Sequence, residues 1–430
     1  MNEGYLSIKF SFNISGKFYF EPEIKVFNRN FIDFKRVERK FLNNLVFHIG
    51  MVELVSYWKA TCSPKIIIQT HFLDDEQIQW WKKLYFNGLG EFFYLNGIEP
   101  NLHDFLAIET GNDALPVCNN DLDESKVIVP VGGGKDSAVT LETISGKGLN
   151  IIPFAVNPRD AIVRTIEIAG YKMEETLVLE RTIDPKLLEL NKKGFLNGHT
   201  PFSALLAFVA VLSGVLANAR YIALSNESSA NQSTVPGSKI NHQYSKSFEF
   251  ETDFVWYVKK FIHSNIQYFS FLRPLNELQI AKLFSNLPQH FHSFRSCNVG
   301  SKTDTWCGHC PKCLFTYVIL SPFVLPPILS GIFGKNLLHD ESLEPILDEL
   351  TGISVVKPFE CVGTPQEVNI ALKMAFEKYQ GQVPELLEKS NSNISKNISE
   401  TDISLLLNAF NEENLVPEKF LQYLTEALYD

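Results

Sequence analysis

The sequence has no run of basic residues long enough to follow a nucleic-acid backbone. Asp and Glu number 49 against 39 Lys and Arg, so the net charge at pH 7 is -10. General nucleic-acid binding relies on clustered positive charge, so this composition argues against it. Residues 1–5 lack a basic stretch followed by an apolar core, and we therefore expect no secretory signal. There is also no internal repeat.

Cysteine is scarce and unevenly placed. The seven cysteines are an odd number, and four of them fall within residues 297–313. That crowding suits a metal site in a reducing cytosol better than a frame of disulfides, so we expect a cytoplasmic protein. With 430 residues, 45% of them hydrophobic and 20% charged, the chain is typical of a soluble globular protein of two or three domains.

Two uncharged runs approach the ~20 residues of a membrane span. Residues 201–219 are apolar, and residues 314–334 are similar but contain Pro322, Pro326 and Pro327. The first run leads at once into a strand-like segment, residues 221–225. We therefore interpret it as a buried helix that crosses over to a strand, with no part of the chain in a membrane.

The pattern along the chain predicts an α/β fold. Residues 1–118 are expected to form a small α+β domain, with a hairpin over 5–27 that turns at Gly16. Residues 119–330 alternate strands and helices, which predicts a parallel sheet with helices on both faces. Residues 331–430 are predicted to be helical, with an exposed polar linker near 389–400. The expected strands are 66–70, 127–131, 151–156, 176–179 and 221–224, and the expected helices are 37–58, 74–86, 365–380 and 403–410, with others starting at 135 and 160.

The most informative segment is residues 127–137 (VIVPVGGGKDS), an apolar strand followed by three glycines and a helix start. Glycines let backbone N–H groups converge on an anion, and a helix N-terminus adds positive potential. The spacing is neither that of Walker A nor that of the dinucleotide motif. A turn without a ligand is the alternative, but Lys135 and Asp136 have no packing role in such a turn.

This segment resembles the Ser-Gly-Gly-x-Asp-Ser loop of the PP-loop ATP pyrophosphatases, with Gly132 in place of the first serine. The resemblance implies a PP-loop, adenine-nucleotide alpha-hydrolase-like sheet and ATP as a ligand. Asn157 ends the next expected strand, beside the expected position of adenine or ribose. The candidate nucleotide-binding residues are Val131, Gly132, Gly133, Gly134, Lys135, Asp136, Ser137 and Asn157.

A polar strip follows the strand at 221–224. Residues 226–231 and 241–247 are dense in polar side chains and lie at the end of the sheet where ligands of α/β proteins bind. A merely solvated loop is the alternative reading. Glu227 is a candidate Mg²⁺ ligand, and His242 and Lys246 are candidates for acid, base or carboxylate clamp. His199 is a weaker candidate, because a histidine at a helix start is often only a cap.

The cysteine-rich segment has the spacing of a metal site. Cys307, Cys310 and Cys313 are three residues apart, and Cys297 supplies a fourth thiolate for a tetrahedron. Zn²⁺ in a closed structural site is expected; His309 replacing one thiolate is the alternative, and an Fe–S cluster fits less well. The remaining cysteines, Cys62, Cys118 and Cys361, are isolated in sequence and are predicted to be core or surface residues.

Taken in order, the loop, the polar strip and the cysteine segment resemble the ATP-dependent UDP-N-acetylmuramoyl-L-alanyl-L-glutamate epimerases of bacterial peptidoglycan synthesis. Residues 50–59 (GMVELVSYWK) and 80–90 (WWKKLYFNGLG) are similar to the front segment of that family, and we do not expect packing alone to account for them. The resemblance covers about residues 40–325. A similar glycine loop together with a similar cysteine-rich segment also occurs in the shorter 7-cyano-7-deazaguanine synthases.

The resemblance implies an isomerase that adenylates the terminal L-Glu of UDP-MurNAc-L-Ala-L-Glu and inverts it to D-Glu, releasing AMP and pyrophosphate. It would thus serve cell wall synthesis, and with it cell shape and division. Lys135 would hold phosphates and Asp136 Mg²⁺, with Glu227, His242 and Lys246 as proton-transfer candidates. The front domain, rich in Trp and Tyr, is expected to hold the nucleotide sugar. Implied substrate-binding residues are Arg159, Arg164, Asn226 and Ser228.

Two other functions fit parts of the pattern. One is a nucleobase- or tRNA-modifying PP-loop enzyme that adenylates a different substrate, and the other is a nucleotide-binding regulator without turnover. The acidic composition disfavours the first, and intact Lys135, Asp136 and Ser137 disfavour the second. The partner expected is a small molecule, and the sequence does not predict the oligomeric state.

Overall fold

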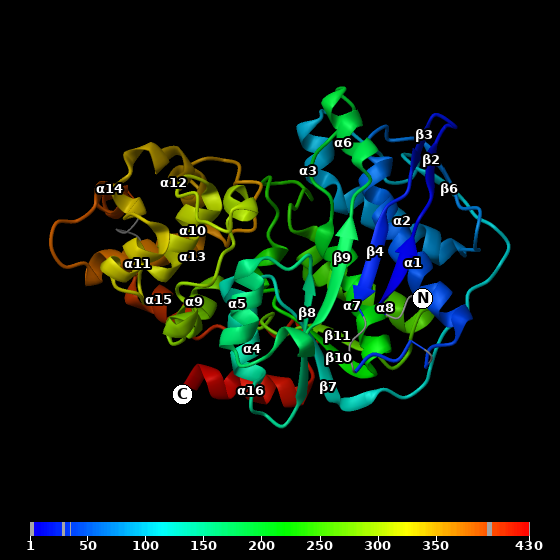
Figure 1. Ribbon diagram of the computed structural model, residues 1–430. Coiled ribbons are helices and arrows are strands. Elements are labelled where there is room, and N and C mark those ends of the chain that lie inside the picture. The colour runs from blue at the N-terminus through cyan, green and yellow to red at the C-terminus, as the bar shows by residue number, and fades with distance from the viewer. Residues whose placement is uncertain (1–3, 28–30, 35, 394–397, 430) are drawn as a thin grey trace.

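The computed structural model describes residues 4–27, 31–34, 36–393 and 398–429. Its centre is a seven-stranded sheet in the order β1-β4-β9-β8-β7-β10-β11 (Figure 1). The strands from β9 to β11 run parallel, and the β4–β9 and β1–β4 pairs are antiparallel. The predicted α/β class with a mostly parallel sheet is therefore confirmed. The strands are β1 Tyr5–Lys9, β4 Glu23–Phe27, β7 Asp123–Pro130, β8 Asn150–Val156, β9 Leu177–Thr182, β10 Ala219–Leu224 and β11 Gln267–Ser270.

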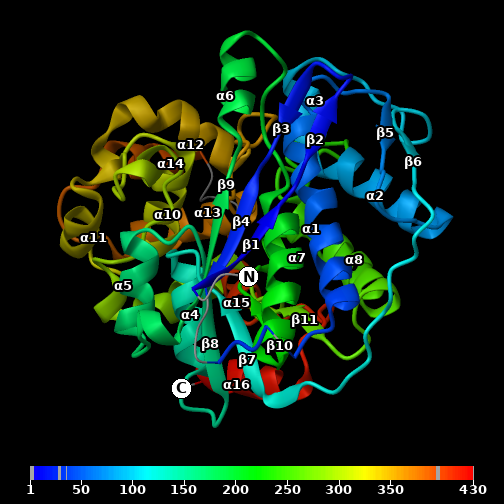
Figure 2. The ribbon, with the colours of Figure 1, turned by 45° about the vertical axis from the view of Figure 1, so that its right-hand side comes forward.

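Alternating side chains of the strands feed two separate cores, as a period of two requires. In β7, Val127 and Val129 belong to one core, and Ile128 belongs to the other. Helices cover both faces, with α1, α7 and α8 on one side and α4 and α5 on the other (Figure 2). These helices are α1 Arg39–Trp58, α4 Lys135–Ile144, α5 Asp160–Ile168, α7 Phe202–Ala217 and α8 Phe248–Phe261.

The apolar run at 201–219 forms α7, and nearly all of its side chains are buried between the sheet and α1. Complete burial explains why the helix is apolar on every side. It ends at Asn218, which adopts a left-handed conformation with φ of 56°. Within the described ranges, no helix combines the length and apolar character needed to cross a bilayer.

The front segment contributes strands to the main sheet. β1 and β4 extend it next to β9, while β2 (Phe12–Ile14) and β3 (Phe18–Phe20) form a separate hairpin at Gly16. Consequently residues 5–27 pack with the strands that follow residue 119; the domain boundaries themselves stay a prediction. The other front elements are α2 Asp75–Gly88, α3 Gly90–Leu95, and the parallel pair β5 Lys65–Ile67 and β6 Ala107–Glu109.

The two adjacent tryptophans of the front segment, Trp80 and Trp81, lie in the core. Trp81 is fully buried, and Trp80 contacts the ring of Tyr257 with centroids 4.3 Å apart. Trp81 also stacks on Phe208 of α7 at 5.3 Å. Packing therefore does account for these two residues, contrary to the expectation from the sequence, and a role of the front segment in holding the nucleotide sugar stays a prediction.

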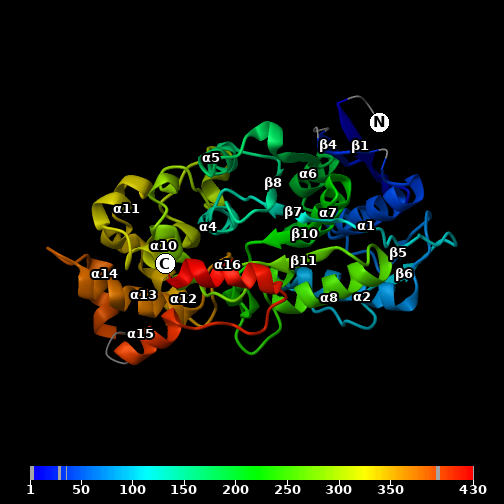
Figure 3. The ribbon, with the colours of Figure 1, turned by 90° about the horizontal axis from the view of Figure 1, so that it is seen from below.

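The C-terminal helices gather on one side of the molecule, at the left in Figure 1. The final helix instead returns to the sheet, where Phe420 contacts Tyr221 of β10 and Phe269 of β11 (Figure 3). A linker is predicted near residues 389–400. Residues 389–393 instead form the end of helix α14, and residues 394–397 lie outside the described residues. The remaining helices are α6 Pro185–Lys192, α9 Glu277–Ser285, α10 Pro311–Leu320, α11 Pro326–Phe333, α12 Glu344–Thr351, α13 Pro365–Lys378, α14 Glu385–Asn393, α15 Glu400–Leu407 and α16 Glu418–Tyr429.

Candidate functional site

The glycine loop lies at the carboxyl end of β7 and leads directly into α4. Gly133 has φ of 78°, and a Cβ there would lie 3.0 Å from the backbone of Ala161 and Ile162 at the start of α5. Its carbonyl accepts a hydrogen bond from the backbone N–H of Arg295 at 2.7 Å. Gly134 caps α4 without a side-chain hydrogen bond. The helix N-terminus therefore keeps the backbone donors and positive potential that suit an anion.

Lys135 points inward and is buried. Its Nζ donates to the carboxylates of Asp136 and Glu277, the latter at the first residue of α9. The sequence-predicted phosphate lysine thus joins the loop to a helix that begins 142 residues later.

Three carboxylates meet beside this lysine. Asp136, Glu227 and Glu277 each offer an oxygen, and the three oxygens lie within 4.8 Å of one another. Glu227 and Glu277 are buried, and burial raises the pKa of both above the usual range of a carboxyl. Lys246, Lys135 and Arg273 oppose that effect at Glu227, and Lys135 opposes it at Glu277, but burial prevails at both. The donor set, oxygen only and clustered, is that of a divalent cation such as Mg²⁺.

The polar strip is anchored by an arginine that the sequence did not single out. Arg273 is fully buried, and its guanidinium donates to the carbonyls of Glu227 and Lys246. It also pairs with Glu251 of α8 at 2.9 Å. These bonds fix the backbone of two predicted site residues, so the strip is an ordered part of the site and the solvated-loop alternative does not apply.

A second cluster lies further along the strip. Glu91 of α3, His199 and His242 each place one ligand atom within 4.8 Å of the others, and the Nδ1–H of His242 donates to Glu91. Burial lowers the pKa of His242, but hydrogen bonds with Cys361 and Glu91 outweigh it and raise the pKa to about 9. Burial and the neighbouring charge of His242 lower the pKa of His199 to about 4.

Cys361 lies next to this cluster, although it is isolated in sequence. Its Sγ is 3.4 Å from the Nζ of Lys246. Burial raises the pKa of the thiol, but Lys246, Lys312 and His242 lower it well below its usual range. The segment between α12 and α13 therefore belongs to the site.

Most of the other predicted site residues form hydrogen bonds with other parts of the chain. The side chain of Asn157 exchanges hydrogen bonds of 3.0 and 2.8 Å with the backbone of Arg181, which ties β8 to β9. Arg159 donates to the carbonyl of Ser301 at 2.7 Å, and Arg164 is exposed on α5. Asn226 donates to Ser270 at 3.0 Å, and Ser228 to the carbonyl of Leu275 at 2.9 Å. Val131 is buried, and Ser137 donates to the carbonyl of Gly134 at 3.1 Å.

Sequence reasoning missed Glu277, Arg273, Glu91 and Cys361. Glu277 had a signal, because it follows β11, whose carboxyl end lies at the same edge of the sheet as those of β7 and β10. Recognising residues 267–270 as a strand would have pointed to it. Glu91 and Cys361 carry no local signal and are brought in only by tertiary packing.

The four cysteines form a separate cluster. Sγ separations are 3.8 Å for Cys297–Cys310, 3.7 Å for Cys307–Cys313 and 3.5 Å for Cys310–Cys313. A metal–sulfur distance of about 2.3 Å in a tetrahedron gives an edge of about 3.8 Å, so the sulfurs fit one Zn²⁺. The ring of His309 is exposed and bonds the carbonyl of Cys307 at 2.8 Å, outside the group of four sulfurs.

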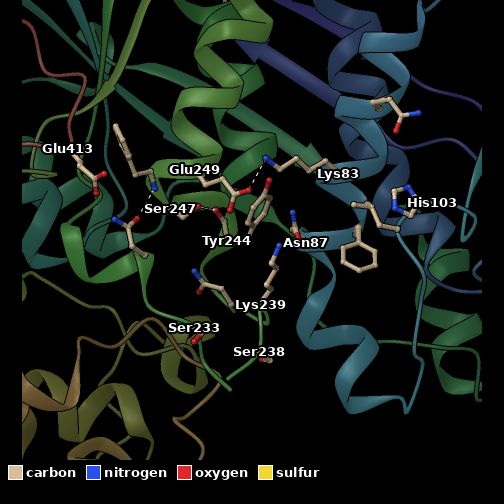
Figure 4. Close-up of a pocket in the computed structure, with 16 residues that line it drawn as sticks. Lys83, Asn87, His103, Ser233, Ser238, Lys239, Tyr244, Ser247, Glu249 and Glu413 are labelled. Atoms are coloured by element: carbon tan, nitrogen blue, oxygen red, sulfur yellow. Dashed lines mark hydrogen bonds and ion pairs between the residues drawn. The ribbon is translucent and has the colours of Figure 1, made fainter. Parts of the chain in front are cut away.

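A cavity of about 750 Å³ lies between α2 and the polar strip (Figure 4). Lys83 and Asn87 of α2 line one side, and Lys239, Asn241 and Tyr244 line the other. Asn241 precedes His242 in sequence, but Glu91, His199 and His242 are not among the residues that line the cavity. Lys83 is engaged with Glu249 and Asp253 at 2.8 and 2.6 Å, whereas Lys239 is exposed.

Comparison with known proteins identifies related chains. A family model of the MurL N-terminal domain matches residues 1–271, and one of the MurL C-terminal domain matches residues 293–404. A protein of Xanthomonas oryzae pv. oryzae named UDP-N-acetyl-alpha-D-muramoyl-L-alanyl-L-glutamate epimerase is 32% identical, over 86% of this chain and 83% of its own. Proteins of the same name from Micromonospora sp. and Salinispora tropica are each 35% identical, over 77% and 75% of this chain and 74% and 71% of theirs.

Proposed function

Because this chain belongs to the MurL family and its relatives are named as epimerases, we propose that it inverts the terminal L-Glu of UDP-MurNAc-L-Ala-L-Glu to D-Glu. The observation that carries the proposal is the match to relatives of that name over most of their length. The chain is accordingly an isomerase. A nucleobase- or tRNA-modifying function is not favoured, because all three relatives carry the epimerase name.

The reaction needs activation of the glutamate. A free carboxylate makes the neighbouring Cα–H a very weak acid, because proton removal places a second negative charge beside the first. Transfer of AMP from ATP to the α-carboxylate removes that charge and gives an acyl-adenylate whose enolate is delocalised. Proton removal, reprotonation on the opposite face and hydrolysis then yield D-Glu, AMP and pyrophosphate. Each turnover would therefore consume one ATP in peptidoglycan precursor synthesis.

ATP would bind at the glycine loop, in a PP-loop type of sheet. The support is the open N-terminus of α4 and the close approach of Gly133 to α5, which leaves room for phosphates over the exposed Gly132. Residues Val131 to Ser137 would contact the phosphates through backbone donors, with Lys135 next to them. Asn157, at the end of the adjacent strand, would lie near the adenosine.

Asp136, Glu227 and Glu277 would hold Mg²⁺, which neutralises phosphate charge and favours departure of pyrophosphate. Their clustering and the raised pKa values of two of them support this, because such a group needs a cation to stay ionised. Lys135 supplies one positive charge, and it orients the carboxylates of Asp136 and Glu277.

The substrate would lie along the polar strip. The cavity in Figure 4 is large enough for the nucleotide-sugar part, and its asparagine and lysine side chains suit a base and a diphosphate. The dipeptide end would then reach His242 and Lys246, with Arg159, Arg164, Asn226 and Ser228 towards the nucleotide loop. His242, Lys246 and Glu227 stay candidates for proton transfer.

Cys297, Cys307, Cys310 and Cys313 would hold a structural Zn²⁺. A closed site of four thiolates leaves no position for substrate, so the ion would stabilise the loop that leads into α10. The backbone N–H groups of Gly300 and Gly308 donate to the sulfurs of Cys297 and Cys313 at 3.1 and 3.4 Å, which holds both sulfurs in place.

Purified protein given ATP, Mg²⁺ and UDP-MurNAc-L-Ala-L-Glu tests the proposal. AMP, pyrophosphate and the chirality of glutamate after hydrolysis are measured, with UDP-MurNAc-L-Ala and free L-Glu as control substrates. We expect inversion and AMP release only with the dipeptide substrate. Inversion at the same rate without ATP would disprove the activation step, and no inversion with ATP would disprove the epimerase assignment.

A further inference from the structure

Cys361 lies beside Lys246 and His242 of the polar strip. It comes from the segment between α12 and α13, far in sequence from the glycine loop and the polar strip. Yet its Sγ lies 3.4 Å from Lys246 Nζ, and Arg273 holds the carbonyls of both Lys246 and Glu227. The thiol is half-buried and so stays reachable from the site. The sulfur thus adjoins Lys246 and His242, and Lys246 in turn interacts with the carboxylates of Glu227 and Asp136.

The charges that face Cys361 favour the thiolate. Lys246, Lys312 and His242 provide positive charge, and together they lower the pKa of the thiol although burial raises it. Burial raises the pKa of Glu360, the preceding residue, above its usual range. A thiolate is a competent base for an acidic Cα–H, and its thiol is a competent acid for the enolate.

The other candidates are less suited to removing a proton. The charge of Cys361 raises the pKa of Lys246 above its usual range, so the amine stays protonated. His242 donates to Glu91 and is itself protonated up to a pKa of about 9. Lys246 and His242 are therefore cations that hold the sulfur in place. Neither is a free base that could accept a proton from the substrate.

We propose that Cys361 is one of the two proton-transfer residues of the epimerisation, with Lys246 and His242 as its positioning residues. The inference rests on the proposed function. The Cα–H bond of the activated glutamate breaks as an S–H bond forms, and the electron pair enters the enolate of the acyl group. A second acid of the site protonates the opposite face of the enolate. The Cys361 thiol then returns its proton to water.

Cys361→Ala and Cys361→Ser test this, with Cys62→Ser as the matched control. Cys62 is also half-buried, but burial raises its pKa to about 11. Inversion and deuterium uptake at the glutamate Cα from D₂O are measured beside substrate-dependent AMP release. We expect both Cys361 variants to lose at least 100-fold in inversion and to keep AMP release within threefold of wild type, and the control to match wild type in both.

Two outcomes would overturn the proposal. Inversion by Cys361→Ala within tenfold of wild type would show that the thiol moves no proton. An equal loss of inversion and AMP release would show that Cys361 only holds the substrate. If the wild type itself inverts nothing, the proposed function has failed, which is a different result from a loss confined to the variants.

Alkylation of the wild-type protein keeps the test independent of variant folding. Iodoacetamide at pH 6.5 should modify Cys361 at least tenfold faster than Cys62, as mapped by mass spectrometry, because only a thiolate reacts. UDP-MurNAc-L-Ala-L-Glu should slow the reaction at Cys361 alone. Equal rates at the two cysteines, or no protection by substrate, would contradict the assignment.

Discussion

Lys135 and Glu277 form a buried ion pair that joins the start of α4 to the start of α9. The side chains are 7% and 6% exposed, so the charge of Lys135 is compensated by Glu277 and Asp136, whereas Asp136 repels the carboxylate of Glu277. Loss of one member of a buried pair leaves the other uncompensated, which is costly. The same lysine is proposed to face the phosphates of ATP, so stability and nucleotide use are linked at this position.

Lys135→Ala should therefore lower both the stability of the protein and its use of ATP. We expect a loss of about 3–5 kcal/mol in the free energy of unfolding, the usual cost of breaking a buried pair. Substrate-dependent AMP release should fall at least 100-fold. Urea denaturation and AMP release are the measurements, and Lys147→Ala is the control, because that lysine forms a half-exposed pair with Glu426 worth ~1 kcal/mol or less. An unchanged stability for Lys135→Ala would contradict the buried pair.

Gly133 and Gly132 offer a matched comparison within the loop. A Cβ at Gly133 meets the backbone of α5 at 3.0 Å and the residue has positive φ, whereas a Cβ at Gly132 meets nothing within 4 Å. Gly133→Ala should lose roughly 1–3 kcal/mol in unfolding free energy, and Gly132→Ala should unfold like wild type. Thermal and urea denaturation of both variants measure this difference in stability. Equal stabilities would mean that the loop lies further from α5.

The fold was largely predictable where a pattern is local. Alternating strands and helices from β7 to β10 follow from short apolar runs bounded by polar residues, and the structure has them. The addition of β1 and β4 next to β9 was not predictable, because it depends on pairing between segments more than 150 residues apart. Trp80 and Trp81 were misread because composition does not say which side of a helix faces the core.

The site divides in the same way. Lys135, Asp136 and Glu227 come shortly after the strands β7 and β10, so the order of the strands brings them together. His242 and Lys246 follow later in the polar strip, beyond the reach of that argument. Glu277 could have been predicted only after β11 had been recognised as a strand. Cys361 and Glu91 stand alone in their segments, and only the packing of the C-terminal region and α3 against the strip places them there.

His242 should make stability depend on pH. Its pKa is raised to about 9 in the folded protein, against about 6.5 when unfolded. The folded state therefore binds more protons between these values, and the stabilisation is complete below pH 6.5 and lost as the pH rises through 9. The stabilisation is about 3 kcal/mol at most. Urea denaturation of wild type and His242→Gln at pH 6.5 and 9.5 should show a gap that narrows at the higher pH; a constant gap would contradict the shift.

Lys239 should affect substrate binding alone. It is exposed at the cavity of Figure 4, which we propose receives the diphosphate part of the substrate. Lys239→Glu should raise the KM for UDP-MurNAc-L-Ala-L-Glu at least tenfold with little change in the KM for ATP. Lys259→Glu on α8 is the control, because that lysine is also exposed but does not line the cavity. Equal KM values in the two variants would place the nucleotide sugar elsewhere.

The cysteine cluster should be structural and hold zinc. Elemental analysis of the purified protein should give one zinc per chain and no iron. Cys310→Ser removes a sulfur that lies within 3.8 Å of both Cys297 and Cys313, so it should lose the metal and unfold at a markedly lower temperature. Cys118→Ser is the control, since that thiol bonds only to Asn120 among its described contacts. A Cys310→Ser protein with wild-type stability and activity would rule out a structural zinc, and iron with visible absorption would indicate a cluster in its place.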